Sequence, residues 1–299
     1  MTKIIFVQPM TINTTLAAQC EGRTIVLDVA FNAGSPQGRG TPEEQFQNTT
    51  GAFIEALGPK LVLWLDHHPH NNWNNYTNDP RFVLIPHEQA PSCPPLITPN
   101  IYTEYGPADT IVCHGDFDGI ASAVTYMKQG QEAYEGLFRD ADAIDSRTGT
   151  PSKKAIWMDN ALKADLRDDT IRYAICNYLM YSNEYEAEET INGAAKRYET
   201  VQQATNEAIS RYDDVRQHIV CVVVDTTKGI DLTALLIAGQ RASEVAIVLQ
   251  KDTNTATIAA SPKWNFVALF GLPGGKPNRV NLSLDNYPLE QILNTIDPL

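Results

Sequence analysis

The chain has 299 residues, of which 43% are hydrophobic, and carries a formal net charge of −13 with a pI near 4.8. This length predicts two domains or one large one, with enough apolar residues for a buried core. The absence of an 18-residue apolar run argues against a membrane span, and MTKIIFVQPM at the N-terminus lacks the apolar core of a signal peptide. Five single cysteines without a C-x-x-C pair indicate reduced thiols and a cytoplasmic location.

The first half of the chain alternates apolar runs with helical patterns. A helix is predicted over residues 41–58, where Thr41 can act as the cap and Pro42 occupies the first turn, and a second helix is predicted over 120–130. Segment 86–107 holds six of the 18 prolines and shows no periodicity, which indicates a loop or crossover. Strands are predicted at KIIFVQ (3–8), TIVLDVAF (24–31), KLVLWLD (60–66), FVLIP (82–86) and DTIVCHG (109–115).

The second half begins with a mostly helical and polar stretch over residues 155–218. A strand–helix–strand unit follows, with HIVCVVVDTT (218–227), DLTALLIAGQRAS (231–243) and EVAIVLQKD (244–252), and then two more strands at 255–261 and 278–284. The predicted fold class is α/β: a doubly wound, mostly parallel sheet over 1–165, a helical connecting segment over 166–218, and a smaller α/β domain over 219–299.

Polar side chains follow the predicted strand 109–115 in the segment IVCHGDFDGIASAV. His114, Asp116 and Asp118 stand at alternate positions, so an extended backbone would place them on one side of the sheet. Buried carboxylates repel one another and lose hydration, and a cation offsets both costs. The alternative for this stretch alone is a solvated strand end that caps the next helix.

Two more predicted strands end in potential ligands. LVLWLDHHPHNN (61–72) ends its apolar run at Asp66, His67 and His68, and TIVLDVAF contains Asp28. Open α/β sheets bind ligands at the carboxyl ends of their strands, so these residues are predicted to meet at one edge. Imidazole suits Mn, Fe, Co or Zn and carboxylate suits Mn or Mg, which indicates a metal site.

These segments resemble the signature motifs of the DHH phosphoesterases. DHH at 66–68 and CHGDFDGIASA at 113–123 are similar to two of the motifs, and VLDVAFN at 26–32 resembles a third, a strand that ends in Asp. The superfamily includes RecJ-type exonucleases, oligoribonuclease/pAp phosphatases and manganese-dependent pyrophosphatases. Its usual order places H-x-D-x-D-G first, whereas here that motif comes last, so the chain resembles a circularly permuted member. The resemblance covers residues 1–165 well and 219–299 loosely.

The resemblance implies two divalent metal ions, with Mn²⁺ as first choice and Mg²⁺ or Co²⁺ as alternatives. Asp28 would bridge them; one ion would also bind His114 and Asp116, and the other would also bind Asp118, His67 and a fourth-motif Asp. Such a pair of ions activates water and stabilises the oxygens of an in-line displacement. Two catalytic roles are implied as well: His68 would contact a phosphoryl oxygen or the leaving group, and Asp66 would hold an imidazole by a hydrogen bond.

The fourth-motif Asp is predicted within FRDADAIDSRTG (138–149). Asp142 is the first choice and Asp145 the second, and an acidic helix start with solvated carboxylates is the alternative.

The substrate loop of the family is matched only loosely by GLPGGKPNRV (271–280). Gly274 and Gly275 would allow close backbone approach, and Lys276 and Arg279 would contact a phosphate or carboxylate. An ordinary Pro-Gly turn is the alternative.

The predicted function is a metal-dependent phosphoesterase that hydrolyses a small phosphodiester or phosphomonoester, such as a short oligonucleotide or nucleotide. The alternatives are a pyrophosphatase- or polyphosphatase-like hydrolase, a RecJ-type single-strand exonuclease and, last, a non-catalytic binding protein. None of segments 1–165, 166–218 and 219–299 has a basic excess, which argues against long nucleic acid as a partner. No membrane partner is predicted, and the oligomeric state stays open, a dimer included.

Overall fold

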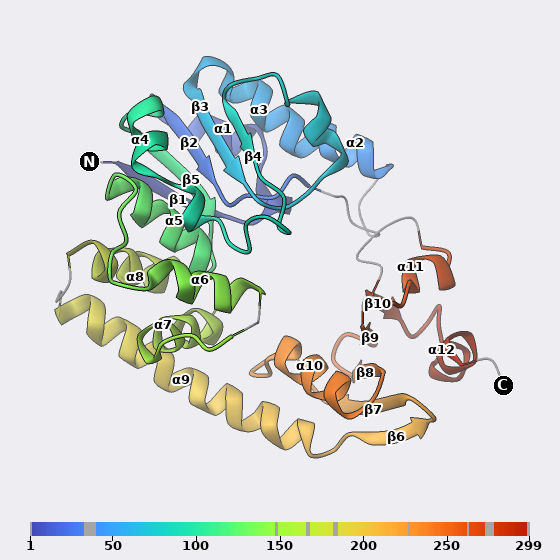
Figure 1. Cartoon of the computed structure of the whole chain (residues 1–299). Coiled ribbons are helices and arrows are strands. Elements are labelled where there is room, and N and C mark those ends of the chain that lie inside the picture. Colours follow the sequence, from blue (N-terminus) through green and yellow to red (C-terminus); the bar gives the residue numbers. More distant parts are fainter. Residues whose placement is uncertain are drawn as a thin grey trace. The chain divides into compact units, whose positions relative to one another are not determined.

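The structure of the chain is a computed structural model. It describes residues 2–32, 40–146, 149–165, 168–181, 185–226, 228–261, 263–272 and 278–297. The chain forms two compact units, residues 1–33 with 42–196 and residues 34–41 with 197–299. The division falls inside helix α9 (Tyr185–Ile209), and therefore within the segment 166–218 that the sequence predicts as a connector. Each unit is built on a single sheet (Figure 1).

The first unit contains a five-stranded sheet in the order β1-β5-β2-β3-β4, with every neighbouring pair parallel. Its strands are β1 (Lys3–Val7), β2 (Thr24–Leu27), β3 (Leu61–Asp66), β4 (Phe82–Leu84) and β5 (Thr110–His114). Their near-continuous apolar runs are typical of parallel strands that are buried on both faces. Although β5 is the last of the five in the chain, it lies between β1 and β2, so β2 has β5 on one side and β3 on the other.

Helices cover both faces of this sheet, which confirms the predicted doubly wound α/β class. On one face, Val26, Trp64 and Val112 pack in a cluster with α1 (Thr14–Gln19) and α3 (Ala52–Leu57). On the other face, Ile25 and Ile111 pack with α4 (Pro99–Tyr105) and α5 (Phe117–Met127). Alternate residues of each strand thus enter opposite cores, as the period of a strand requires. The helix predicted over 41–58 consists of α2 (Pro42–Phe46), a π-helical turn (Gln47–Gly51) and α3.

Segment 86–107, predicted as a loop or crossover without periodicity, connects the parallel strands β4 and β5, but it also contains the helix α4, which was not predicted. Thr98 caps this helix by accepting a hydrogen bond from the amide of Ile101 at 3.3 Å, and Pro99 stands in its first turn. Proline is favoured at that position because the helix has no acceptor for its missing N–H. The prolines that suggested an irregular segment therefore include one that begins a helix.

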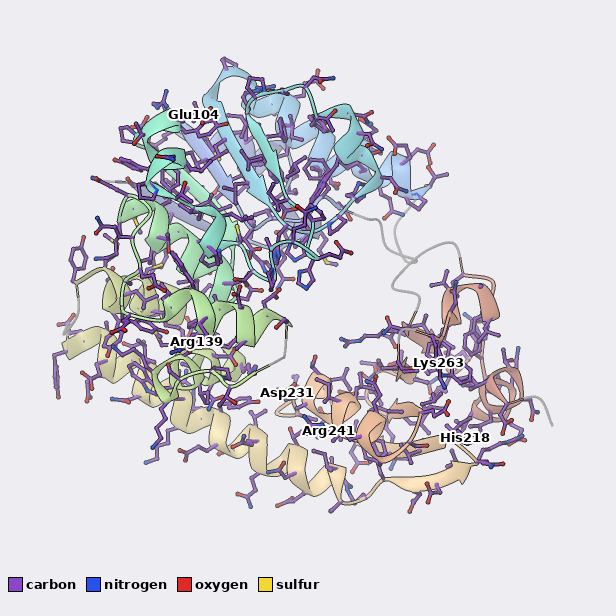
Figure 2. The ribbon with its side chains drawn as sticks, in the orientation of Figure 1. Glu104, Arg139, His218, Asp231, Arg241 and Lys263 are labelled. Carbon is purple, nitrogen blue, oxygen red and sulfur yellow. The ribbon has the colours of Figure 1, made fainter. Side chains whose placement is uncertain are left out.

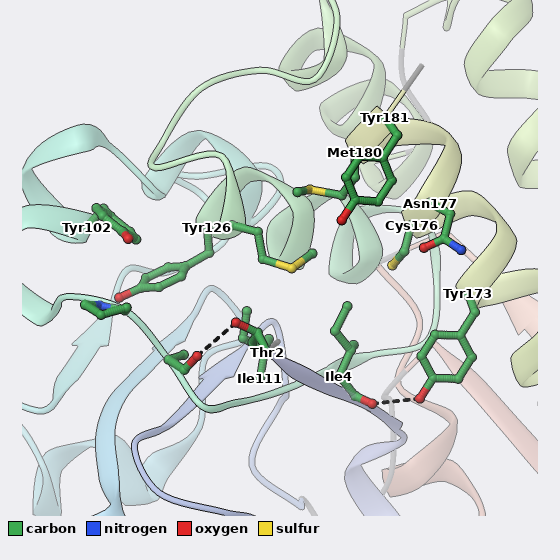
Figure 3. Close-up of a pocket in the computed structure, with 13 residues that line it drawn as sticks. Thr2, Ile4, Tyr102, Ile111, Tyr126, Tyr173, Cys176, Asn177, Met180 and Tyr181 are labelled. Carbon is green, nitrogen blue, oxygen red and sulfur yellow. Dashed lines mark hydrogen bonds between the residues drawn. The ribbon is translucent and has the colours of Figure 1, made fainter. Parts of the chain in front are cut away.

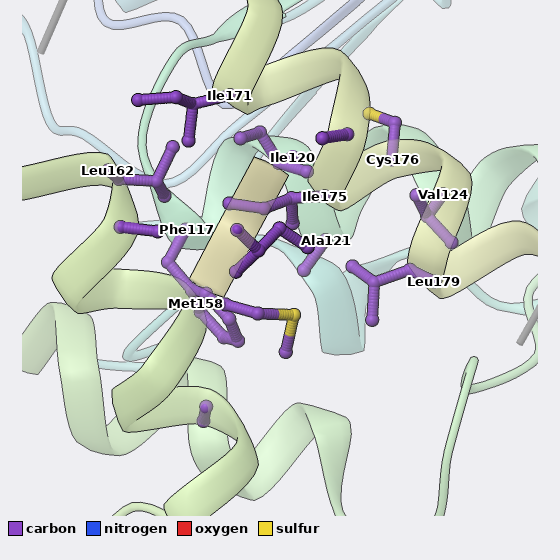
Figure 4. Close-up of a cluster of buried hydrophobic side chains, with 14 of the residues drawn as sticks. Phe117, Ile120, Ala121, Val124, Met158, Leu162, Ile171, Ile175, Cys176 and Leu179 are labelled. Atoms are coloured by element: carbon purple, nitrogen blue, oxygen red, sulfur yellow. The ribbon is translucent and has the colours of Figure 1, made fainter. Parts of the chain in front are cut away.

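A second layer of helices packs on α5. It consists of α6 (Leu137–Ser146), α7 (Lys153–Ala164), α8 (Asp169–Tyr181) and the first part of α9. Phe117 and Ile120 of α5 share one buried cluster with Met158 of α7 and Ile175 of α8 (Figure 4). Because α5 is enclosed between this cluster and the sheet, its first turn is held firmly at the carboxyl end of β5.

The second unit contains a mixed sheet in the order β10-β9-β8-β7-β6. The strands β7 (Ile219–Val224) and β8 (Val245–Gln250) are parallel, and β6 (Asp213–Arg216), β9 (Thr255–Ala260) and β10 (Arg279–Ser283) pair antiparallel. Helix α10 (Leu232–Ala242) packs on one face, and α11 (Phe266–Leu269) and α12 (Leu289–Ile296) pack on the other. The predicted smaller α/β domain is therefore present, with one more strand, β6, and two more helices than the sequence predicted.

Two further observations concern the whole of the described chain. All five cysteines are buried and occur as free thiols. Within the described residues, no helix combines the length and the apolarity needed to cross a membrane.

Candidate metal centre

The carboxyl ends of three adjacent strands, β5, β2 and β3, bring the predicted ligands together. Asp28 follows the central strand β2, His114 ends β5 on one side, and His67 follows β3 on the other. Asp28 Oδ1 lies 3.2 Å from His67 Nε2, and Asp28 Oδ2 lies 4.0 Å from His114 Nδ1. Asp118 Oδ2 lies 3.7 Å from His67 Nε2, and Asp116 Oδ2 lies 2.7 Å from His114 Nδ1. Asp28 therefore faces both His67 and His114, and Asp116 likewise lies within ligand distance of His114 on one side and of Asp118 and Asp145 on the other.

The H-x-D-x-D-G segment forms the turn from β5 into α5. Asp116 is the N-cap of α5, and its Oδ1 accepts a hydrogen bond from the amide of Gly119 at 3.2 Å. A Cβ at position 119 would lie 2.4 Å from the carbonyl oxygen of His114, so only glycine allows the helix to begin this close to the strand. Asp118 stands in the first helical turn with only 2% of its surface exposed. The glycine of the motif thus has a steric cause, and the extended backbone predicted as far as Asp118 is replaced by a helix that begins at Phe117.

Asp28 adopts an uncommon backbone conformation at the centre of the cluster. Its φ is 58°, in the left-handed region that residues other than glycine rarely enter. Its amide donates a hydrogen bond to the carbonyl oxygen of Leu65 at 2.9 Å, which extends the pairing of β2 with β3 by one residue. Backbone strain of this kind concentrates at functional sites.

Several buried polar atoms of the cluster lack a hydrogen-bond partner within the described part of the chain. They are both carboxylate oxygens of Asp28, Oδ2 of Asp66, Nε2 of His67 and Oδ2 of Asp118. Burial raises the pKa of Asp28, and repulsion from Asp116 and Asp66 raises it further. Burial and repulsion from Asp28 raise the pKa of Asp118 in the same way. Unpaired buried groups cost free energy, and cations between these oxygens would remove that cost.

His114 and Asp116 form the more open side of the cluster, with 26% and 43% of their side-chain surfaces exposed. Burial alone would lower the pKa of His114, but the adjacent Asp116 outweighs burial and raises it. Burial likewise works to raise the pKa of Asp116, but His114 outweighs it and the net pKa is lowered. Without a cation these two side chains therefore satisfy each other, whereas Asp28 and His67 at the buried base do not.

His68 and Asp66, the two residues predicted to have catalytic roles, are hydrogen-bonded to each other. Nδ1 of His68 donates to Oδ1 of Asp66 at 2.8 Å, and Asp66 is fully buried. His68 is 40% exposed, and its Nδ1 lies 3.8 Å from Oδ1 of Asp28. Asp66 thus holds the ring of His68 at the border between the cluster and solvent.

The fourth carboxylate is where the structure departs from the sequence-based choice. Oδ2 of Asp145 lies 3.9 Å from Nε2 of His67, so Asp145 joins the cluster. Asp142 instead accepts a hydrogen bond from the hydroxyl of Ser92 at 2.6 Å, and it belongs to none of the acid–histidine groups found among the described residues. Both carboxylates lie on α6 within one helical turn, about 4.5 Å apart along the axis, and Asp145 is the one that meets His67.

His87 also reaches the cluster and was not predicted. Its Nδ1 lies 3.2 Å from Nδ1 of His67 and 3.9 Å from Oδ2 of Asp145. A single histidine in a proline-rich segment forms no pattern with its sequence neighbours. The only available signal was its position just after the fourth strand, which ends at the same edge of the sheet.

The remaining predicted substrate-binding residues lie elsewhere. Arg279 begins β10 of the second unit. Gly274, Gly275 and Lys276 lie outside the described residues.

A cavity of about 390 Å³ in the first unit lies near the amino ends of the strands (Figure 3). Tyr102, Tyr126 and Tyr173 line it together with Thr2. The hydroxyl of Tyr173 donates to the carbonyl oxygen of Ile4 at 2.8 Å. None of the clustered acids or histidines contributes to this cavity.

No protein-family model and no curated protein matches the sequence. One similar solved structure is the exonuclease RecJ bound to manganese, with a TM-score of 0.52 and 11% identity over 95% of this chain and 77% of that chain. A second is RecJ in complex with Mn²⁺ from Thermus thermophilus, with a TM-score of 0.50 and 10% identity over 95% of this chain and 45% of that chain. A third is the pGpG-specific phosphodiesterase PggH from Vibrio cholerae, with a TM-score of 0.49 and 13% identity over 78% of each chain. The similarity to RecJ shows that the chain has a DHH-type fold, which confirms at the level of fold the resemblance that the sequence motifs indicate.

Proposed function

We propose that the chain is a divalent-metal-dependent phosphoesterase that hydrolyses a small phosphodiester or phosphomonoester. The observation that carries this proposal is the buried carboxylate of Asp28, whose two oxygens are unpaired while acids and histidines approach from both sides. A mixed set of carboxylate and imidazole ligands suits Mn²⁺, which is also the metal of the RecJ structures.

The residues fall into two sets that share Asp28. The first comprises Asp28, His114 and Asp116; the second comprises Asp28, His67, Asp118 and Asp145. Two divalent cations held by these sets would supply Lewis acidity that activates water for attack on phosphorus and neutralises charge on the reacting oxygens.

Protein groups around the cations would orient the ligands and the substrate. Nδ1 of His67 donates to the carbonyl oxygen of Ala90 at 2.9 Å, which leaves Nε2 as the ring nitrogen with a lone pair toward Asp28. Nδ1 of His68 donates to Asp66, and among the described residues Nε2 of His68 has no hydrogen-bond partner. Because His68 is partly exposed, that nitrogen is available for a hydrogen bond to a phosphoryl oxygen or to the leaving group.

Electrostatics favour a small substrate. Long strands bind by releasing counterions to Lys and Arg along a track, and this chain has a net charge of −13 with no basic excess in any of its three predicted segments. A RecJ-type exonuclease is the second candidate, because the manganese-bound RecJ structure is similar over 95% of this chain.

The test is a substrate panel with Mn²⁺-loaded protein. The panel contains p-nitrophenyl phosphoesters, pAp, pyrophosphate, and single-stranded DNA and RNA from dinucleotides to about 20-mers. We expect turnover of dinucleotides or of pAp, with no gain on longer strands, and no turnover by Asp28→Asn at equal protein and metal concentrations. Activity that rises with strand length and falls steeply with added salt would instead establish the exonuclease. A protein that binds Mn²⁺ and hydrolyses none of the panel would contradict the proposal.

A further inference from the structure

His87 lies outside every motif that carries the family resemblance, yet its side chain reaches the metal centre. Its ring centroid is 5.0 Å from that of His67, and its Nδ1 lies 3.9 Å from Oδ2 of Asp145. Within the described part of the chain, the polar contacts of His87 are with these two residues, and both belong to the second proposed ligand set.

The contact between the two histidines is poorly explained as an ordinary hydrogen bond. When Nε2 of His67 is the ligand atom, Nδ1 of the same ring carries a single proton. The carbonyl oxygen of Ala90 accepts that proton at 2.9 Å, whereas Nδ1 of His87 lies farther from Nδ1 of His67, at 3.2 Å. The orientation of His67 is therefore fixed without His87. A different role is needed for a histidine that lies beside two ligands.

The distances suit coordination of a common ion. One ligand atom from each of His67, His87 and Asp145 lies within 4.8 Å of the others, as three ligands of a single cation do. Nε2 of His67 is fully buried and has no hydrogen-bond partner among the described residues. A cation bound to Nε2 would therefore stabilise His67 whether or not His87 is present. His87 is 44% exposed and approaches from the loop after β4.

We propose that His87 is an additional ligand of the cation held by His67 and Asp145, and that this second imidazole makes the position favour Mn²⁺, Co²⁺ or Zn²⁺ over Mg²⁺. The inference rests on the proposed two-metal centre and adds to it a determinant of metal selectivity. Its physical basis is that imidazole is a good ligand for the later divalent metals, whereas Mg²⁺ prefers oxygen and retains its water.

The experiment compares wild type, His87→Ala and His87→Gln by metal binding rather than by turnover. His218→Ala is the matched control, since His218 is also exposed and also lies 3.9 Å from a carboxylate, that of Glu244, but it belongs to the second unit (Figure 2). Affinities for Co²⁺, Mn²⁺ and Mg²⁺ come from titration of the metal-free proteins. Pulsed electron paramagnetic resonance on Mn²⁺-loaded protein counts the bound imidazole nitrogens.

We expect His87→Ala to weaken Co²⁺ binding at one of two sites by about 10- to 100-fold and Mg²⁺ binding by less than about threefold. One imidazole nitrogen should disappear from the Mn²⁺ spectrum in both His87 variants, and His218→Ala should match wild type. His87→Gln should retain Mg²⁺ binding, because its amide oxygen can replace the lost ligand.

Two results would overturn the inference and leave the proposed function standing. One is a wild-type protein with two ions whose affinities and nitrogen count are unchanged in His87→Ala. The other is an equal loss of Mg²⁺ and Co²⁺ affinity with an unchanged nitrogen count, which would mean that His87 only supports His67. A wild-type protein that binds no ions would instead remove the proposed two-metal centre itself.

Discussion

The two ends of the first unit's sheet satisfy their polar groups in opposite ways. At the amino ends, the carboxylate of Asp109 accepts a hydrogen bond from the amide of Arg23 at 2.8 Å, and the hydroxyl of Thr110 exchanges two hydrogen bonds of 2.9 Å with the backbone of Glu21. At the carboxyl ends, Asp28 and Asp118 are deeply buried, and three of their four carboxylate oxygens have no hydrogen-bond partner in the described chain.

The two ends of the sheet therefore differ in what they contribute: the amino ends contribute stability, and the carboxyl ends carry the proposed site. The amino end is completed by the chain itself, so its polar groups stabilise the fold. The carboxyl end concentrates charges that repel one another, so it is destabilising until something of opposite charge binds. A protein retains such a cost where activity requires it. The following experiments test this contrast, from the largest expected effect to the smallest.

The substitution Asp28→Asn should have the largest effect. We expect Mn²⁺-dependent hydrolysis to fall by more than about 100-fold and at least one of two ions to be lost, because the shared carboxylate is gone. The metal-free protein should become more stable by about 1 kcal/mol, since a buried charge is removed from among other carboxylates. Metal analysis and urea unfolding measure the two effects; a variant that keeps both ions would contradict the bridging role.

Saturation with Mn²⁺ should raise the free energy of unfolding. The increase should come only from binding at the carboxyl ends of the strands in the first unit's sheet. At a free Mn²⁺ concentration of 100 times Kd, linkage predicts about 2.7 kcal/mol for each site. Asp109→Asn, at the amino end, should lower the baseline stability by about 1 kcal/mol and leave the Mn²⁺ increment unchanged. Thermal or urea unfolding with and without Mn²⁺ provides the measurement. An increment that shrinks in Asp109→Asn would show that the two ends are not independent.

The two carboxylates of α6 provide a matched pair for the fourth ligand. Asp145→Asn should weaken Mn²⁺ binding by at least about tenfold, because its carboxylate lies 3.9 Å from Nε2 of His67. Asp142→Asn, which changes a group bonded to Ser92, should alter Mn²⁺ affinity by less than about threefold. Titration of both variants decides between them, and the reverse order of effects would restore Asp142 as the ligand.

The smallest effect concerns an ion pair at the amino end. Hydrogen bonds from Arg81 lower the pKa of Asp79. A lowered folded-state pKa contributes stability above the unfolded pKa of about 3.9, and this stability is lost as the pH falls through the folded-state pKa. Asp79→Asn should therefore lower the free energy of unfolding by about 0.5 kcal/mol at pH 7, and this deficit should shrink as the pH falls below about 3.9. Urea unfolding over a series of pH values measures this; a deficit that does not change with pH would exclude the ion pair as its cause.

Local sequence patterns determined much of the architecture. Every strand of the first sheet was predicted, because each is a short apolar run with a clear end. The extended backbone predicted through His114, Asp116 and Asp118 was wrong, because β5 ends at His114 and Asp118 already lies in the first turn of α5. The helix α4 was missed because proline is ambiguous in sequence: it interrupts a helix in the middle but favours one at the first turn, as Pro99 does.

Strand order and helix placement were decided only by tertiary packing. Asp28 faces both His67 and His114 because β2 lies between β3 and β5, whatever the order of these strands in the chain. Asp145 rather than Asp142 meets His67 because of where α6 packs, and His87 reaches the same point from a loop after β4. The sequence by itself determined which strands end in potential ligands, since that information is local. Which of those side chains meet depends on contacts between distant segments, and residue spacing does not encode such contacts.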